Sequence, residues 1–313
     1  MSNYGIHHLT AIAGNPNETL YFYNEVLGLR LVKQTVNFDD PKAYHLYFGN
    51  ADAKPGTLLT FFNREDQRQG VLGDGQISMI WLAIPKGSFT YWENRLKSHG
   101  IAVTYQTSYQ EEGLVFQDNH GLSIRLVERS VNQANTWSVD DLKPSTAIHS
   151  IAGATLLSSD YKRTIQLLTS AFGYQIGAQE GVHTLLQLKQ NPEQGVEIKS
   201  SKKGRGVYGI GSVHHIAFRT SSIEQQNQMR ATLSSFTPKL TSIKDRTYFE
   251  STYFREPGGH LIELATDGPG FFVDENESQL GLDLQLPSFL NSNRNQIEQT
   301  LPQLHQPKGG HYA

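Results

Sequence analysis

Two stretches in the second half of the chain decide how it folds and what it can bind. They are VHHIAF at residues 213–218 and GHLIEL at residues 259–264. Apolar and polar residues alternate in both, which is typical of short β-strands with one buried face. A histidine and a glutamate on neighbouring strands can hold a divalent metal ion, but they need a further ligand. The stretch IHHLT at residues 6–10 offers one at the opposite end of the chain.

Each of the two histidine pairs can supply one ligand. Successive side chains of a strand point to opposite faces, so either His7 or His8, and either His214 or His215, faces a shared metal ion. Glu263 supplies the carboxylate. The chain contains no cysteine, so a metal ion has to be held by histidine and carboxylate groups, and disulfides and thiol catalysis are excluded.

The stretch at 213–218 belongs to an internal repeat. Four similar strand openings begin at Ile6, Ile77, Ile148 and Val213. Each opening is followed by an amphipathic helical pattern and then by two or three short alternating segments with turn residues between them. The hairpin FQDNHGLSIRL at 116–126 also repeats the pattern of FREPGGHLIEL at 254–264. The chain therefore predicts an α+β fold built from four βαβββ modules.

The modules group into two halves of the sequence. Residues 129–146 are polar and end in a Lys-Pro pair, which indicates a linker. We expect modules one and two to form a domain within residues 4–130, and modules three and four to form a second domain within 147–267. Residues 268–313 are expected to form a C-terminal tail with one amphipathic helix.

Composition limits the partners and the compartment. The 313 residues carry a net charge of −3 without a basic block, so nucleic acid is not an expected partner. The N-terminus lacks the pattern of a signal peptide, and no apolar stretch is long enough to span a bilayer. The sequence therefore predicts a cytoplasmic protein that does not bind a membrane.

A fourfold βαβββ repeat, with histidine in a first strand and glutamate in a last strand, resembles the vicinal oxygen chelate superfamily. That superfamily includes glyoxalase I, bleomycin-binding proteins and extradiol dioxygenases. The resemblance spans about residues 4 to 266. The stretches IHHLTAI at 6–12, VKQTVNFD at 32–39 and GGHLIELATD at 258–267 look like the branch of hydroquinone-type ring-cleaving dioxygenases. The resemblance implies two incomplete β-barrel cups, each built from two modules, with a metal ion inside a cup.

The resemblance also selects one histidine of each pair. In the superfamily the ligand is followed by an apolar residue and then by Thr or Ala, which implies the ligand set His8, His215 and Glu263. The corresponding positions of modules two and three carry Met79 and Ser150. We therefore expect modules one and four to form one metal-binding cup, and modules two and three to form an empty second cup. Extradiol dioxygenases usually take their ligands from the later two modules, so this chain departs from that pattern.

Two histidines and one carboxylate on one face of a metal ion leave open positions for a substrate and O2. This arrangement predicts non-haem Fe(II), with Mn(II) or another divalent metal as the alternative. Zinc prefers a tetrahedral site and has no redox chemistry with which to activate O2.

The resemblance implies roles for four neighbours of the ligands. His7 and His214 would act as acid/base groups, and Tyr253 and Arg246 would stabilise an anionic oxygen of the substrate. Without the resemblance, a barrel-wall tyrosine and a solvated arginine would be the better interpretation of the last two. Aromatic candidates for the pocket wall, for which core packing is the usual role, are Tyr44, Tyr47, Phe48, Phe61 and Phe62.

These observations predict a metal-dependent, extradiol-type dioxygenase that opens a hydroquinone or catechol ring with O2 in the degradation of aromatic compounds. The alternatives on the same fold are a glyoxalase-type lyase, a thiol transferase and a non-catalytic binding protein. Thr60 stands where glyoxalase I carries a second glutamate, the four-module length disfavours the short transferases, and the retained ligand set disfavours a binding protein. A homodimer that pairs through the edge strands of such cups is a further expectation.

Overall fold

The computed structural model describes residues 5–130, 137–139, 142–237, 239–305 and 311–312, so parts of the expected linker and tail lie outside the described residues. Its mixture of many strands and few helices confirms the α+β fold with four βαβββ modules.

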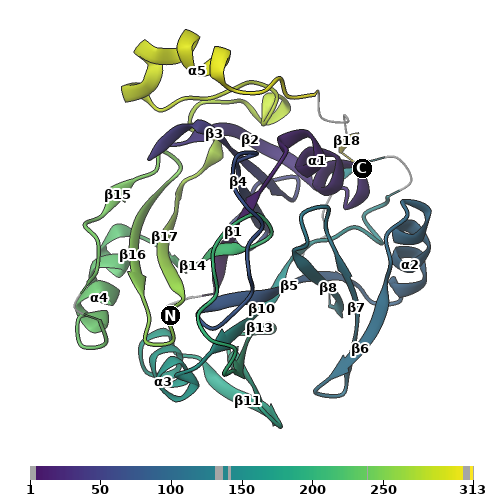
Figure 1. The fold of residues 1–313 in the computed structure, drawn as a ribbon, viewed down its shortest axis with the longest axis vertical. Coiled ribbons are helices and arrows are strands. Elements are labelled where there is room, and N and C mark those ends of the chain that lie inside the picture. The colour runs from purple at the N-terminus through teal and green to yellow at the C-terminus, as the bar shows by residue number, and fades with distance from the viewer. Residues whose placement is uncertain (1–4, 131–136, 140–141, 238, 306–310, 313) are drawn as a thin grey trace.

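The four modules contain the same elements in the same order (Figure 1). Module one consists of β1 (Ile6–Ala13), α1 (Pro16–Leu20), the π-helical η1 (Tyr21–Val26), β2 (Arg30–Asn37), β3 (Asp40–Gly49) and β4 (Leu58–Asn63). Module two consists of β5 (Gln76–Pro85), α2 (Phe89–Ser98), β6 (Thr104–Ser108), β7 (Glu111–Gln117) and β8 (Ser123–Arg129). Module three consists of β10 (Ser150–Ser158), α3 (Tyr161–Phe172), β11 (Gln175–Glu180), β12 (His183–Leu188) and β13 (Asn191–Ser200). Module four consists of β14 (Val213–Thr220), α4 (Ile223–Leu233), β15 (Lys244–Asp245), β16 (Phe249–Arg255) and β17 (Leu261–Pro269).

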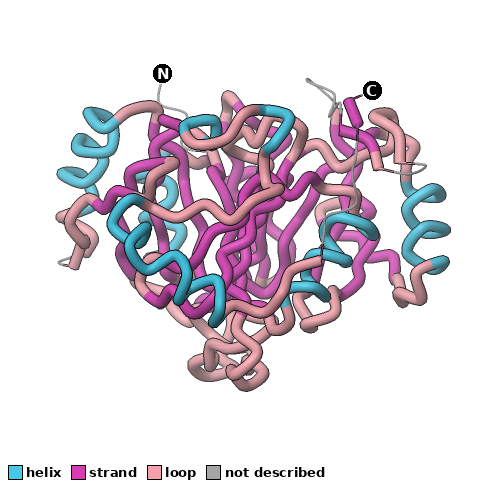
Figure 2. The backbone as a smooth tube through the Cα atoms, turned by 90° about the horizontal axis from the view of Figure 1, so that it is seen from above, coloured by secondary structure: helices cyan, strands magenta, loops and turns pink. Residues whose placement is uncertain are grey.

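Within every module the first strand pairs in parallel with the last strand, as β1 does with β4 and β14 with β17. Parallel neighbours need a crossover connection, and the helix of each module is part of it. The helices lie outside the strands, as Figure 2 shows, and bury one apolar side against the sheet.

Pairing between modules produces two cups. Strand β1 is antiparallel to β14, so modules one and four share one curved sheet, which we name the first cup. Strand β5 is antiparallel to β10, so modules two and three share the second cup. A contact between Ile77 of β5 and Val213 of β14 joins the cups into one 16-stranded sheet among the described residues. Both cups are open barrels.

Two local features are less regular than their counterparts in the other modules. The helix of module one continues from Leu20 as a π-helix in which Leu27 N donates to Phe22 O. Phe22 and Tyr23 are both buried in this π-helical turn. In module four the second strand is reduced to β15 (Lys244–Asp245).

The C-terminal tail lies across the outer strands of module one (Figure 1). It contains η2 (Phe271–Val273), η3 (Glu277–Gln279), η4 (Ser288–Asn293) and α5 (Arg294–Thr300), while β18 (His311–Tyr312) pairs with β9 (Trp137–Ser138). Gln34 of β2 donates to Gly281 O at 2.7 Å and accepts from Gln285 N through its backbone carbonyl at 2.8 Å. The buried ammonium of Lys33 contacts Asp274 at 2.5 Å, and Glu275 as well. These contacts hold the tail against β2.

No helix in the described part of the chain has both the length and the apolar character needed to cross a membrane.

The tail contact predicts different costs for two glycine substitutions. Gly281 and Gly173 both have positive φ, 75° and 74°, so an alanine at either position costs about 1–2 kcal/mol of backbone strain. At Gly281 a Cβ would also lie 2.0 Å from Leu31 O, whereas at Gly173, which ends α3, it would meet nothing within 4 Å. We expect Gly281→Ala to lower the urea midpoint more than Gly173→Ala. Equal midpoints would show that the tail does not depend on its close approach to β2.

Candidate metal centre

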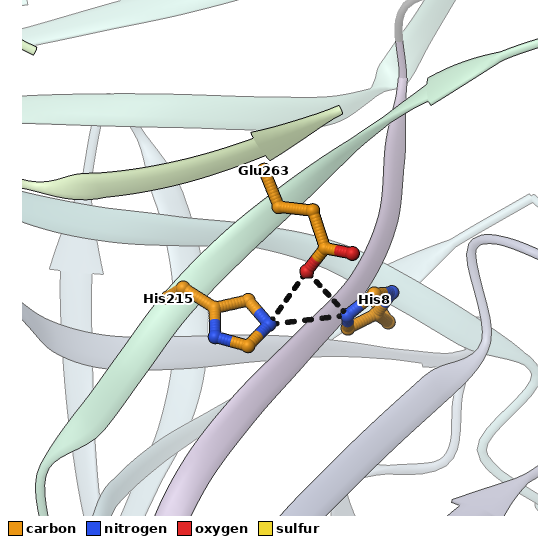
Figure 3. A group of neighbouring side chains, drawn as sticks. All are labelled: His8, His215 and Glu263. Carbon is orange, nitrogen blue, oxygen red and sulfur yellow. Dashed lines mark hydrogen bonds and ion pairs between the residues drawn. The ribbon is translucent and has the colours of Figure 1, made fainter. Parts of the chain in front are cut away.

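His8, His215 and Glu263 come together in the first cup, on β1, β14 and β17. Across the three neighbouring strands, His8 pairs with Ala217, which in turn pairs with Glu263. His215 precedes Ala217 by two residues, so its side chain lies on the same face of the sheet. Figure 3 shows the three side chains pointing toward one another. Strand pairing between the two ends of the chain therefore assembles the group.

The three side chains have ligand atoms at contact distance. His8 Nε2 lies 3.2 Å from His215 Nε2 and 3.2 Å from Glu263 Oε2, and His215 Nε2 lies 2.8 Å from the same oxygen. All three residues are buried. Among the described residues this is the one group of three His, Cys, Asp or Glu side chains whose ligand atoms all lie within 4.8 Å of one another.

One carboxylate oxygen in this group has no hydrogen-bond partner among the residues that the structure describes. Glu263 Oε1 accepts from Ser251 Oγ, but Oε2 is fully buried without a donor, although the two ring nitrogens lie at ion-pair distance. A buried carboxylate oxygen without a donor is costly. Two imidazole nitrogens and a carboxylate are also a donor set that a divalent metal ion accepts. The residues present therefore fit a divalent cation at this point.

Hydrogen bonds behind His8 fix which nitrogen faces the centre. His7 Nε2 lies 3.2 Å from the carbonyl of Thr266, which can only accept, so this nitrogen carries the proton. Burial lowers the pKa of His7 far below its ordinary value, so the ring is neutral and its Nδ1 accepts from His8 Nδ1 at 2.9 Å. With Nδ1 of His8 as the donor to His7, Nε2 is the nitrogen of His8 that faces the centre.

His214 and His215 make the same contact between ring nitrogens, but His214 lies in different surroundings from His7. His214 Nδ1 and His215 Nδ1 lie 2.8 Å apart. Burial lowers the pKa of His214 to about 3 and also lowers the pKa of His215, so both rings are neutral near pH 7. His214 has no carbonyl partner like that of His7, and its ring lines a cavity.

Two connected cavities adjoin the centre. The inner cavity, of about 30 Å³, is lined by His8, His215, Glu263, Arg246 and Tyr253, with six further residues. The outer cavity, of about 390 Å³, shares five lining residues with the inner one and adds His214 to the wall. His7 belongs to neither lining. It lies behind His8 with its ring 5.2 Å from the ring of Phe249.

Tyr253 and Arg246 form a polar wall beside the centre. Burial and the nearby Glu263 raise the pKa of Tyr253, so the phenol keeps its proton. Burial opposes the charge of Arg246, but Tyr253 and Asp39 outweigh it and raise the pKa of the guanidinium. Arg246 Nη2 donates to Asp39 at 3.0 Å, and Nε lies 3.4 Å from the hydroxyl of Tyr253. The wall therefore offers one O–H group and one fixed positive charge.

Sequence reasoning did not single out His45, which also lines the inner cavity. Its Nε2 lies 2.9 Å from Thr60 Oγ1 and its Nδ1 lies 3.0 Å from the hydroxyl of Tyr47. The alternation of β3 places His45 and Tyr47 on one face, opposite Thr60, and that spacing was the available signal. Of the aromatic candidates, Tyr47 and Phe62 line the inner cavity, whereas Tyr44, Phe48 and Phe61 belong to the hydrophobic core.

The second cup has positions that correspond to His215 and Glu263 of the first cup. Glu197 pairs with Thr155 as Glu263 pairs with Ala217, so Glu197 is in register and not displaced. The residue two before Thr155 is Gly153, so the expectation that Ser150 matches His215 was wrong by three residues. Glu197 contacts Thr155 Oγ1 at 2.7 Å, Tyr109 Oη at 3.0 Å and His183 Nδ1, on the same module, at 3.0 Å. Unlike Glu263, this carboxylate has hydrogen bonds to both oxygens.

The buried histidines predict that metal-free protein loses stability in acid. Burial lowers the pKa of His7, His45, His149, His214 and His215. Below about pH 6.5 the unfolded chain therefore binds more protons than the folded one, and the free energy of unfolding falls by up to about 1.4 kcal/mol per histidine per pH unit. The pKa of Glu263 lies below its ordinary value, so it is ionised in both states here and contributes no change.

Urea titrations of the metal-free protein at about pH 7.5, 6.5 and 5.5 measure this loss. A free energy of unfolding that stays constant over this range would contradict the assignment of neutral, buried rings.

Comparison with known proteins supports the fold and extends it to a family. Residues 5–126 and 148–264 match the sequence model of the "Glyoxalase/Bleomycin resistance protein/Dioxygenase superfamily". A crystal structure of a "putative dioxygenase" from Bacillus subtilis superposes with a TM-score of 0.94 at 43% identity, covering 97% of this chain and 99% of the other.

Two relatives are similar over nearly their whole length. The Bacillus subtilis protein named "Putative ring-cleaving dioxygenase MhqO" is 44% identical over 297 residues, which cover 95% of each chain. The "Chlorohydroquinone/hydroquinone 1,2-dioxygenase" of Sphingobium indicum is 26% identical over 307 residues, again 95% of each chain. The predicted resemblance is thereby confirmed, and the chain belongs to the glyoxalase/bleomycin resistance protein/dioxygenase superfamily, which is the vicinal oxygen chelate superfamily.

Proposed function

We propose that the protein is an extradiol-type dioxygenase that uses non-haem Fe(II) and O2 to open the ring of a hydroquinone-type diphenol. The observation that carries the proposal is the buried oxygen Glu263 Oε2, which has no hydrogen-bond donor, faces Nε2 of His8 and His215, and adjoins a cavity. Relatives named as ring-cleaving dioxygenases support the reaction type. Hydroquinone is preferred to catechol as the ring because one relative is named for it.

His8, His215 and Glu263 would hold the metal ion. Their two nitrogens and one carboxylate suit Fe(II), with Mn(II) or another divalent ion as the alternative. When bound, iron would supply open positions for diphenol and O2 and a route for electrons between them. Everything else in the reaction depends on how the protein orients the ring and where it keeps protons.

The two outer histidines would have different roles. His7 is buried behind His8 and bonded to the Thr266 carbonyl, so it positions the ligand and holds its tautomer. His214 lines the outer cavity. With a cation on His215 Nε2, His215 Nδ1 is protonated and donates to His214 Nδ1, which leaves His214 Nε2–H to donate to a substrate oxygen. In that state His214 is a hydrogen-bond donor to the substrate.

Tyr253 and Arg246 would bind the oxygen at which negative charge develops. The phenol of Tyr253 keeps its proton because its pKa is raised, so it can donate to that oxygen. Arg246 adds a fixed positive charge whose direction is set by Asp39. Phe62, Tyr47 and Phe249 close the apolar sides of the inner cavity and keep water from the ring.

A glyoxalase-type reaction fits the site less well. Thr60, at the position of a second carboxylate ligand, is fully buried and bonded to Thr10 Oγ1 at 2.7 Å and to His45. Its hydroxyl is therefore used in the wall of the cup.

The function is tested by loading the purified protein with Fe(II) without oxygen and then following O2 consumption with hydroquinone and methylhydroquinone. We expect one O2 consumed per ring opened. Tyr253→Phe should lower kcat by about 100-fold, because one donor to a developing oxyanion is lost. The matched control is Tyr44→Phe, whose ring lies in the core and whose hydroxyl makes no hydrogen bond to another described residue. No O2 consumption with either diphenol would refute the proposed function.

Metal content tests the ligand set independently of turnover. Glu263→Ala and His8→Ala should lower the iron bound per chain below one tenth of the wild-type content, since either change removes one of three ligands. The control is Glu197→Ala, which removes the carboxylate at the equivalent register of the second cup and should retain full iron. Loss of iron in the Glu197 variant alone would show that the metal is bound in the second cup.

A further inference from the structure

The outer cavity of the first cup has an uneven charge. Three basic residues, Arg64, Lys244 and Arg246, line it together with a single acid, Asp39. The remaining lining residues are His214 and His215, together with side chains that carry no charge. A cavity lined in this way attracts a negatively charged group.

Of these three basic side chains, only Lys244 has no carboxylate of the described residues within hydrogen-bond distance. Arg64 donates to Asp66 through Nε and Nη2 and contacts Asp40 through Nη1. Arg246 is bound to Asp39 at 3.0 Å. Lys244 Nζ has its nearest carboxylate, Asp39 Oδ1, at 3.9 Å, which is beyond hydrogen-bond distance. Its side chain is 40% exposed, so the ammonium is half-buried and available to a ligand.

The inner cavity is too small for the ring of a diphenol, so the ring has to occupy the outer cavity, which Lys244 also lines. The inner cavity of about 30 Å³ holds little more than a water molecule, whereas benzene fits a cavity of roughly 150 Å³. A ring that places a hydroxyl at the metal centre therefore extends into the outer cavity of about 390 Å³. That volume leaves room for a substituent on the ring.

The rest of the lining of the outer cavity suits such a molecule. Phe62 and Leu261 offer apolar surface for the ring, and Gln67 and Thr241 offer polar groups. Asp39 is directed to Arg246 by their ion pair, so an added anion near Lys244 displaces only the long Lys244–Asp39 contact.

We propose that the outer cavity selects diphenols with an anionic substituent, in the chemical class of carboxylated hydroquinones, and that Lys244 is the residue that determines this specificity. The inference rests on the proposed function for the reaction, but the anion site itself does not depend on turnover. Lys244 is the first residue of β15, and Thr241, three residues before it, lines the same cavity.

The first experiment compares kcat/KM for 2,5-dihydroxyphenylacetate and for methylhydroquinone with the Fe(II)-loaded protein. Lys244→Gln should lower the ratio of the two values about tenfold, through KM of the acid and not through kcat, as expected for one lost charged hydrogen bond. Lys244→Arg should restore most of the ratio. Lys162→Gln, on the exposed side of α3, is the matched control and should leave the ratio unchanged. An unchanged ratio in Lys244→Gln would overturn the proposal.

The second experiment separates this proposal from the proposed function. Phenylacetate has no hydroxyl to be oxidised, so its binding to the metal-free protein is measured by calorimetry at low and high salt. We expect binding that weakens about tenfold in Lys244→Gln and also weakens with salt. This result together with no O2 consumption would leave the anion site standing and refute the dioxygenase. O2 consumption together with phenylacetate binding that does not depend on Lys244 would refute the anion site and leave the dioxygenase standing.

Discussion

The antiparallel pairing of β1 with β14 is the contact on which the whole site depends. It places His8 across from the strand that carries His215, and the parallel pairing of β14 with β17 then adds Glu263 from the next strand. Three electron-pair donors thereby meet among buried side chains, beside a cavity little larger than a water molecule. Such a group is stable only with a cation or with protons between its members, because unpaired buried donors are costly. The sheet pairing creates an arrangement of charge that requires a partner.

The two cups have the same architecture, but the buried carboxylate at the equivalent position is satisfied in different ways. In the first cup Glu263 keeps an oxygen without a donor, and Tyr253, Arg246 and a cavity surround it. In the second cup Glu197 receives Thr155, Tyr109 and His183, so its charge is satisfied by the protein itself. The difference between the two sites therefore lies in the hydrogen-bond donors around the equivalent carboxylate, and not in the fold of the cup.

The sequence could predict the modules because strand alternation, helix periodicity and turn residues repeat in each of them. The sequence could also identify His8, His215 and Glu263 as candidate site residues, because each is a polar residue within an apolar strand. Their role as ligands stays a prediction. It could not predict the register of module three. There the pairing of Thr155 with Glu197 puts Gly153, and not Ser150, at the position of His215, so the local likeness of Ile148-His149 to Ile6-His7 was misleading. His45 was missed because its partner Thr60 is set by the pairing of β3 with β4.

The pairing of the first module with the last has a consequence for synthesis of the chain. Modules two and three are neighbours in sequence and can form the second cup as soon as both have emerged from the ribosome. Strand β1 emerges first, yet its partner β14 emerges only after modules two and three, on the order of ten seconds or more afterwards at common translation rates. During that interval β1 presents an open edge with two histidines. The metal centre therefore cannot be completed before β17 of module four has emerged.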